Sequence, residues 1–595
     1  MFTEVWIRKQ DRMYGCMIDG CMIACFLLEL ELELRISLKM FSNISLEELD
    51  FLDNYNISPL PIRLYQNIPR EEKGIPFDIF NYEFLFNDPE TVSLIRNGLT
   101  IGCFYIESPG MRSLLKRLDV TTFEMLTAAS SIIRPGVAES GMMQEFIARH
   151  KYPSRRKYLL PEMETVLGET YGVMIYQEDV IKVAHHIAGL TLEEADVLRR
   201  AMSGKMRSHK AMQLITDRFF ESCNAKEIPP EVSKELWRQI ESFAGYSFCK
   251  AHSASFALLS YQVAYLKVHF PAEFMACVLN NGGGFYSSAV YIQEAKRIGI
   301  NILLPCINES DYEYKGRNKK IRIGLMAVKH LSYTSIQIIL EQRKKYGKYV
   351  SLSDFIVRTK PGIKEVQMLI RCGAMDCFAE TRCTLLRLTD VYFNKFKMLE
   401  EGYNDLFIDE SFELEKAVVT KKDFPIEEKC IAEYEAFDYI VTKHPLEFFT
   451  EYNQKLSLVP SEQMEKYAGR RIKMIGWYMS SKRIRTKKGD IMKFLSLEDL
   501  TGTYEAVIFP RAYSRVAEKT LSMGPYIVDG RIDAENSNNI IVENLDTLSN
   551  VKLKLESHND SAEKYYVPDD EGLREEDIYY STSLNVEKLK TAYAG

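Results

Sequence analysis

The chain reads Ile472-Lys-Met-Ile-Gly-Trp-Tyr-Met479 at the point where its hydrophobic pattern changes from helical to extended. Four further short apolar runs follow it, and a helical run at 511–521 separates the third run of the series from the fourth. These later runs span residues 492–497, 504–509, 526–528 and 540–543. Five short strands, with one helix between the third and the fourth, predict an OB-type β-barrel over residues 465–550.

Helical periodicity dominates the sequence before this barrel. Residues 177–190 place their apolar side chains on one face, and Thr191-Leu-Glu-Glu194 predicts a capping box that opens a helix through Met202. Residues 253–270 predict a long helix that Pro271 closes. Residues 300–385 alternate short helical patterns with turns. The fold class that we predict is multidomain α+β, mainly helical and followed by the barrel.

Composition places the chain among large globular proteins. It has 595 residues, of which 46% are hydrophobic and 27% charged, and its net charge is −7. At ~150 residues per domain this length predicts about four domains. The composition excludes global disorder, and the net charge argues against a uniformly basic nucleic-acid coat protein. Local basic patches are compatible with this net charge.

Cysteine usage and hydropathy indicate the compartment. The 12 cysteines form no C-x-x-C pair, and neither of their clusters has zinc-site spacing. Their scatter along a large chain favours a reduced, cytoplasmic protein. The longest apolar run, residues 21–28, is far shorter than the ~20 residues that span a bilayer. We therefore expect no membrane partner.

The first candidate site lies in Phe243-Ala-Gly-Tyr-Ser-Phe-Cys-Lys-Ala-His-Ser-Ala-Ser-Phe256. Lys250 and His252 stand just before or at the start of the predicted long helix. A helix N-terminus offers free N–H groups and a partial positive charge, so a lysine and a histidine beside it make a phosphate site. The alternative is a plain Ser253 N-cap preceded by a surface lysine.

The second candidate is the pair Arg199 and Arg200, in Leu198-Arg-Arg-Ala-Met-Ser-Gly-Lys205. Adjacent helical residues point ~100° apart, so one arginine can bind a phosphate while the other binds a carboxylate. The alternative for this stretch alone is a solvated face or a structural ion pair.

Basic runs form a third candidate. One covers residues 149–157, and the other, Lys482-Arg-Ile-Arg-Thr-Lys-Lys488, is expected to be the loop between the first two barrel strands. OB folds bind oligonucleotides through that loop and the adjoining strand face, where Trp477, Tyr478 and Phe494 can stack bases. A charge run can equally be a solvated face. The residues predicted to contact DNA here are Lys482, Arg483, Arg485, Lys487, Lys488 and Trp477.

Two segments, 323–331 and 368–375, resemble degenerate helix-hairpin-helix units, whose hairpin N–H groups meet DNA phosphate. The expected hairpin glycines are missing at Lys329-His-Leu-Ser332. A structural helical hairpin is the alternative.

The spacing of carboxylate residues in the sequence predicts no metal site. Two-metal nucleotidyl transfer needs carboxylates that hold cations ~4 Å apart, as a strand-borne D-x-D does. No D-x-D occurs in the sequence, and neither a P-loop nor a G-x-S-x-G or H-E-x-x-H motif is found. We therefore assign no metal ligand and no catalytic carboxylate.

An ordered series of motifs runs from about residue 80 to about residue 550. Besides the stretches already quoted, it comprises Thr100-Ile-Gly-Cys-Phe-Tyr-Ile-Glu-Ser-Pro-Gly-Met-Arg112, Ile133-Arg-Pro-Gly-Val-Ala-Glu-Ser-Gly141, Tyr171-Gly-Val-Met-Ile-Tyr-Gln-Glu178, Pro271-Ala-Glu-Phe-Met275 and Thr442-Lys-His-Pro-Leu446. On these residues the chain resembles the C-terminal part of the bacterial DNA polymerase III alpha subunit, the C-family replicative polymerase.

The resemblance implies a domain order and roles. It implies polymerase fingers at 61–295, a helix-hairpin-helix and clamp-binding region at 296–460, the OB domain at 465–550 and an acidic tail at 551–595. Nucleotide binding is implied for Arg199, Arg200, Lys250 and His252, and DNA or template contact for Arg112, Arg134 and Tyr246. Asn404-Asp-Leu-Phe407 resembles a degenerate sliding-clamp peptide anchored by Leu406 and Phe407.

The family reaction implies dNTP substrates and Mg²⁺, with primer–template DNA, single-stranded DNA, the sliding clamp and other replisome subunits as partners. The family places a metal-binding palm before its fingers, whereas residues 1–60 resemble no palm and stay unassigned. We therefore expect a split subunit or a truncated gene, with the ligands for Mg²⁺ on a palm-bearing chain. The alternative is a non-catalytic DNA-binding remnant or accessory subunit.

Overall fold

The structure, a computed structural model, describes residues 79, 81–133, 141–202, 209–241, 249–282, 284–400, 419–486 and 488–548. These fall into two compact units. One comprises residues 68–270, and the other comprises residues 1–67 with 271–595.

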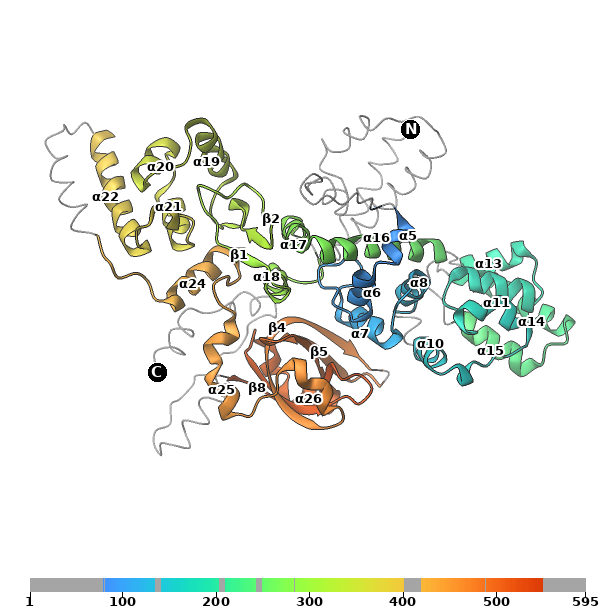
Figure 1. The fold of residues 1–595 in the computed structure, drawn as a ribbon. Coiled ribbons are helices and arrows are strands. Elements are labelled where there is room, and N and C mark those ends of the chain that lie inside the picture. The colour runs from blue at the N-terminus through green and yellow to red at the C-terminus, as the bar shows by residue number, and fades with distance from the viewer. Residues whose placement is uncertain are drawn as a thin grey trace, which may run out of the picture. The chain divides into compact units, whose positions relative to one another are not determined.

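The unit of residues 68–270 is built from helices, among them α16, a helix of 20 residues whose middle is buried. Helices α6 and α8 pack against α16, and Figure 1 shows them beside it. Its helices are α5 (Tyr82–Phe86), α6 (Pro89–Arg96), α7 (Pro109–Leu118), α8 (Phe123–Ile132), α10 (Met142–Lys151), α11 (Glu162–Leu167), α12 (Gln177–Lys182), α13 (Leu192–Met202), α14 (His209–Ala225), α15 (Pro230–Glu241) and α16 (Lys250–His269).

Local signals in the sequence set several of these helix starts. The predicted capping box is confirmed, since Thr191 N–H donates to Glu194 (2.8 Å) and Glu194 N–H donates to the Thr191 hydroxyl (3.2 Å). The helix predicted over 177–190 is α12 followed by a π-helical turn, Val183–Ile187. The Ser253 N-cap is wrong: α16 begins at Lys250, and Ser253 lies buried inside it, where it accepts a hydrogen bond from the Ser131 hydroxyl (2.7 Å).

The second unit opens with helices and one small sheet. The sheet has the strand order β1-β3-β2, with β1 (Asn301–Leu303), β2 (Lys315–Arg317) and β3 (Lys320–Arg322). Its helices before the barrel include α17 (Pro271–Asn280), α18 (Ser288–Arg297), α19 (Tyr333–Tyr346), α20 (Leu352–Thr359), α21 (Ile363–Arg371), α22 (Arg382–Glu400) and α24 (Ile426–Phe437). Across the described ranges of both units, every helix is too short or too polar to cross a membrane.

The predicted five-strand barrel is confirmed. Its strands close in the order β4-β5-β6-β8-β7, and α26 (Pro510–Val516) lies between the third and the fourth in sequence. Figure 1 shows the barrel near the C-terminal end of the described chain. Its strands are β4 (Arg471–Arg485), β5 (Ile491–Glu498), β6 (Thr503–Ile508), β7 (Tyr526–Ile532) and β8 (Asn539–Thr547).

The first strand corrects one expectation. The basic stretch from Lys482 to Arg485 is not a loop, because β4 runs through it and pairs with β5 as far as Arg485 opposite Ile491. An exposed antiparallel ribbon tolerates consecutive charged residues, since their backbone groups stay paired while the side chains reach water. Charge alone therefore does not predict where a strand ends.

Gly476 marks the place where β4 changes partner. Residues 471–476 pair with β7, whereas residues from Trp477 onward pair with β5. A Cβ at Gly476 would lie 2.8 Å from Leu497 Cβ and 2.5 Å from Tyr504 Oη, and both neighbours are buried. The barrel core can therefore close at this strand only around a residue without a side chain.

We predict that Gly476→Ala destabilises the barrel by roughly 1–3 kcal/mol, because buried side chains must move to admit the methyl group. Hydrogen exchange of the whole protein, followed by mass spectrometry, should show amides of β4 and β5 exchanging about 10-fold faster or more. Gly168→Ala is the control, since Gly168 has φ −59° and no atom within 4 Å of the added Cβ. Unchanged barrel exchange in Gly476→Ala would contradict the packing argument.

Candidate functional site

The start of α12 joins two of the predicted nucleotide-binding residues. Gln177, the first residue of α12, accepts a hydrogen bond from Arg199 Nη1 (3.1 Å). The next residue, Glu178, accepts the backbone N–H of Lys250 with both carboxylate oxygens (3.0 and 2.9 Å). Residues from α13 and α16 therefore both contact the first turn of α12, although they are far apart in sequence.

The Lys250 side chain is held by a second carboxylate. Its ammonium lies 2.5 Å from Glu169 Oε1 and 5.6 Å from the centre of the Tyr176 ring. The side chains of Lys250 and Glu169 are 41% and 50% exposed, so this pair stands at the surface. Two carboxylates thus occupy the positions at which an anion would meet the start of α16, one on its N–H and one on its lysine.

A buried carboxyl fixes the turn that carries Glu178. Asp179 Oδ2 accepts the N–H groups of Ile175 (2.9 Å) and Tyr176 (3.0 Å). Burial raises the pKa of Asp179 to about 6, although these two hydrogen bonds oppose the shift. Burial, followed by the charge of Asp179, raises the pKa of Tyr176. The Tyr176 ring below Lys250 therefore acts as a neutral, fixed surface.

Arg199 and Arg200 share one acidic partner. Arg199 Nη2 lies 2.8 Å from Asp196 Oδ1, and Arg200 Nη2 lies 2.5 Å from Asp196 Oδ2. Hydrogen bonds from Arg199 first, and from Arg200, lower the pKa of Asp196. The structure thus contains the ion pair that the sequence left as an alternative. Arg200 remains 56% exposed, so it can still bind a ligand.

His252 lies in the first turn of α16. Its ring centre is 4.3 Å from that of Phe256, in an edge-to-face arrangement, and Phe256 in turn stacks on Tyr105 with centres 4.9 Å apart. The histidine is partly exposed. It therefore stands on an aromatic cluster, two residues after Lys250 in the same turn, with its position set by packing.

The predicted template contacts have different surroundings. Arg112 lies in α7, is partly buried, and donates from Nε to the carbonyl of Gly98 (2.8 Å). That bond anchors the arginine to the end of α6. Arg134 and Tyr246 lie outside the described residues, as do the clamp-peptide residues Leu406 and Phe407.

The barrel exposes most of its predicted DNA-binding cations. Lys482, Arg483 and Arg485 are exposed on β4, and Lys488 is exposed in the turn before β5, whereas Lys487 lies outside the described residues. Trp477 packs against a cluster that includes Leu446 and Ile527. The aromatic side chain is thus partly committed to packing, and the cations form the accessible part of this surface.

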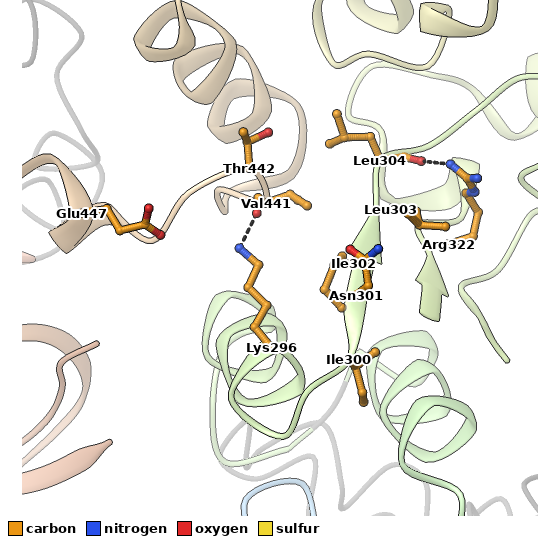
Figure 2. A pocket seen from close by; sticks show the side chains of 10 residues that line it. All are labelled: Lys296, Ile300, Asn301, Ile302, Leu303, Leu304, Arg322, Val441, Thr442 and Glu447. Atoms are coloured by element: carbon orange, nitrogen blue, oxygen red, sulfur yellow. Dashed lines mark hydrogen bonds between the residues drawn. The ribbon is translucent and has the colours of Figure 1, made fainter. Parts of the chain in front are cut away.

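One cavity was not indicated by any sequence pattern. It has a volume of about 510 Å³ and is lined by residues of α18, β1, β3 and the segment after α24. Figure 2 shows Lys296 donating to the carbonyl of Val441, and Arg322 donating to that of Leu304 (2.8 Å). Burial lowers the pKa of Lys296. Both cations here are used to join chain segments.

The described residues do not fit the Mg²⁺ that the family reaction implies. Among them, no three His, Cys, Asp or Glu side chains lie close enough together to hold a metal ion. We therefore derive no step through a metal on the described part of the chain.

Sequence reasoning missed the two carboxylates of the site. Glu169 and Glu178 stand in no recognised ligand spacing, and only the fold brings them to residues 81 and 72 positions away. The available signal was Tyr176-Gln-Glu178 directly before a helical pattern, where an acidic residue in a first turn suits the helix dipole of its own helix. The bond of Glu178 to the N-terminus of α16, 72 residues further along the chain, cannot be read from that signal.

Two domain families match the chain. Residues 61–227 match the bacterial DNA polymerase III alpha subunit finger domain, and residues 299–385 match the helix-hairpin-helix motif. The second match covers β1 to the start of α22 and includes both segments from which the sequence predicted hairpins.

Curated relatives match over a longer stretch. The DNA polymerase III subunit alpha of Staphylococcus epidermidis is 32% identical over 497 residues, which cover 83% of this chain and 45% of the relative. The subunit of Aquifex aeolicus is 33% identical over 511 residues, which cover 85% of this chain and 42% of the relative. The subunit of Staphylococcus aureus is 32% identical over 513 residues, which cover 85% of this chain and 47% of the relative. The chain spans less than half the length of these relatives. It is therefore a relative of the bacterial DNA polymerase III alpha subunit, with a matched finger domain and helix-hairpin-helix motif, followed by a five-strand barrel.

Proposed function

We propose that this chain binds the incoming deoxynucleoside triphosphate and the DNA during template-directed DNA synthesis. The observation that carries the proposal is the meeting of Arg199, Lys250 and the N-terminus of α16 at the first two residues of α12. A triphosphate needs several cations and N–H donors on one side, and these groups supply them. His252 extends the same first turn toward the ligand.

At this site a phosphate can replace a carboxylate as the partner of a cation. The Lys250–Glu169 pair is about half exposed on both sides, and such ion pairs stabilise a protein by only about 0–1 kcal/mol. A phosphate carries more charge than a carboxylate and offers more acceptor oxygens. It can therefore replace Glu169 on the Lys250 ammonium at little cost, while Glu178 keeps α16 in place until the ligand arrives.

The same reasoning applies to Arg199 and Arg200. Asp196 holds both guanidinium groups, and Arg199 also donates to Gln177 at the start of α12, so these long side chains lose less freedom on binding. Arg200 is the more exposed and is the arginine that we assign to the outer phosphate oxygens.

DNA binding is assigned to the barrel and the helical regions. The exposed cations on β4 can follow a single-stranded backbone, as OB-type barrels do. Arg112, Arg134 and Tyr246 are proposed template contacts, and Leu406 and Phe407 a proposed contact to a sliding clamp. The given residues contain no D-x-D pair, so the carboxylates that bind Mg²⁺ are proposed to lie outside them.

Lys250→Ala should weaken binding of a deoxynucleoside triphosphate to the whole protein by about 10- to 100-fold, since a charge-assisted contact contributes about 1.5–3 kcal/mol. Titration calorimetry measures this directly. Lys234→Ala, which removes an exposed lysine of α15, is the matched control and should bind normally. Glu169→Gln should raise the affinity slightly, because it removes the competing charge. Equal affinities of the two lysine variants would contradict the proposal that Lys250 binds the triphosphate.

Replacing Lys482, Arg483 and Arg485 by alanine should weaken single-stranded DNA binding and flatten its salt dependence. Each lost phosphate contact lowers the slope of log affinity against log salt by about 0.7. Fluorescence anisotropy with a labelled oligonucleotide at several salt concentrations gives both quantities. The control exchanges the same residues, Lys482→Arg, Arg483→Lys and Arg485→Lys, and should keep the slope. An unchanged slope in the alanine variant would place the DNA elsewhere.

Primer extension distinguishes the proposed role from its alternative, a non-catalytic DNA-binding module. With primer–template, dNTPs and Mg²⁺, the chain alone should bind both substrates and extend no primer. Robust extension by these 595 residues alone would contradict metal-binding carboxylates that lie outside them. DNA binding without any triphosphate binding would favour the alternative.

A further inference from the structure

Two cysteines far apart in sequence come together in the helix-hairpin-helix region. Cys306 lies just after β1, and Cys377 lies in the short 3-10 turn Asp376–Phe378 that precedes α22. Their thiols lie within hydrogen-bonding reach of each other, and both are free thiols. Cys306 is buried, whereas Cys377 is exposed.

The two segments that carry these cysteines are fixed against one another. Ile307 N–H donates to the carbonyl of Ala374 (2.9 Å), which ties the residue after Cys306 to the turn before Cys377. Asn308 donates from Nδ2 to Cys377 Sγ (3.5 Å) and, in addition, exchanges hydrogen bonds with the backbone of Tyr349 (2.9 and 2.8 Å). The approach of the thiols is therefore set by the fold.

The neighbouring thiol, more than the charges around the pair, lowers the pKa of Cys306. A hydrogen bond with Cys377 lowers the pKa of Cys306, opposed by burial and by Glu309, and the Arg322 guanidinium adds to the lowering. Arg322 is held in place by the carbonyl of Leu304, as Figure 2 shows, and by Glu309. The thiolate is the reactive form of cysteine, and a second thiol beside it can resolve an oxidised sulfur.

We propose that Cys306 and Cys377 form a reversible disulfide when the protein meets a hydroperoxide. The Cys306 thiolate attacks one peroxide oxygen, the O–O bond breaks, and the second oxygen leaves as water after taking up a proton. The resulting sulfenic acid is attacked by Cys377, the S–O bond breaks, and a second water leaves. Two thiols and one hydrogen peroxide thus become one disulfide and two waters.

The disulfide would close the chain between Cys306 and Cys377, which contains β2, β3 and α19 to α21. Cross-linking restricts the unfolded forms of the enclosed segment, so this region should open less often. Oxidation would thereby stiffen the helix-hairpin-helix region without touching the proposed nucleotide site.

Mass spectrometry of the whole protein, treated with hydrogen peroxide and digested without reductant, tests the proposal. The expected product is one cross-linked peptide pair, 306 with 377, that is lighter than the sum of its reduced peptides by two hydrogens and that disappears with dithiothreitol. Cys377→Ser and Cys306→Ser should abolish it. Cys383→Ser, a partly exposed cysteine in the same region, should leave its yield unchanged.

Hydrogen exchange supplies the second readout. Amides of α19 to α21 should exchange several-fold more slowly in the oxidised protein than in the reduced one, and Cys377→Ser should remove this difference. The proposal is overturned if peroxide converts Cys377 to higher oxides without a cross-link, if the cross-link forms only in urea, or if Cys383→Ser lowers its yield as much as Cys377→Ser does.

Discussion

The bond between the Glu178 carboxylate and the backbone N–H of Lys250 is the contact on which the candidate site depends. It joins the first turn of α12 to the first turn of α16 across 72 residues. A negative charge at that place stabilises α16 through its free N–H groups and partial positive end. The same charge holds the position that a phosphate would take. Stability of the unliganded protein and affinity for the ligand therefore use the same donors.

Much of the fold could be predicted because its signals are local. The capping box at Thr191 and Glu194 lies within four residues, and the barrel strands each carry their own apolar pattern. The OB-type barrel, the helical regions and the family resemblance were all recognised from such stretches. Predictions failed where distant contacts decide. Ser253 has the residue type of an N-cap, but its hydroxyl bonds to Ser131, 122 residues away.

The candidate site could be predicted only in part, for the same reason. Lys250, Arg199 and Arg200 were recognisable as cations at helix positions, and the fold brings Lys250 and Arg199 to one turn. Their acidic partners were not recognisable, because Glu169 and Glu178 act through space. The extension of β4 through its basic residues was also missed, since the pairing with β5 decides it and the charges do not.

The helix-hairpin-helix region differs from the proposed nucleotide site. At the proposed nucleotide site, the Lys250–Glu169 ion pair is about half exposed and can exchange partners. Around Cys306 and Cys377, backbone bonds and Asn308 fix the chain, so the chemistry available there is a covalent change between two atoms that already meet. One chain thus holds a replaceable electrostatic contact and a fixed pair of thiols.

The most direct test of the account is hydrogen exchange of the whole protein with and without a deoxynucleoside triphosphate. The triphosphate should change exchange in peptides that cover Glu169 to Glu178 and the first turns of α16, while the barrel is unaffected. A triphosphate that binds but changes exchange only in the barrel, or that leaves both of those segments unchanged, would contradict it.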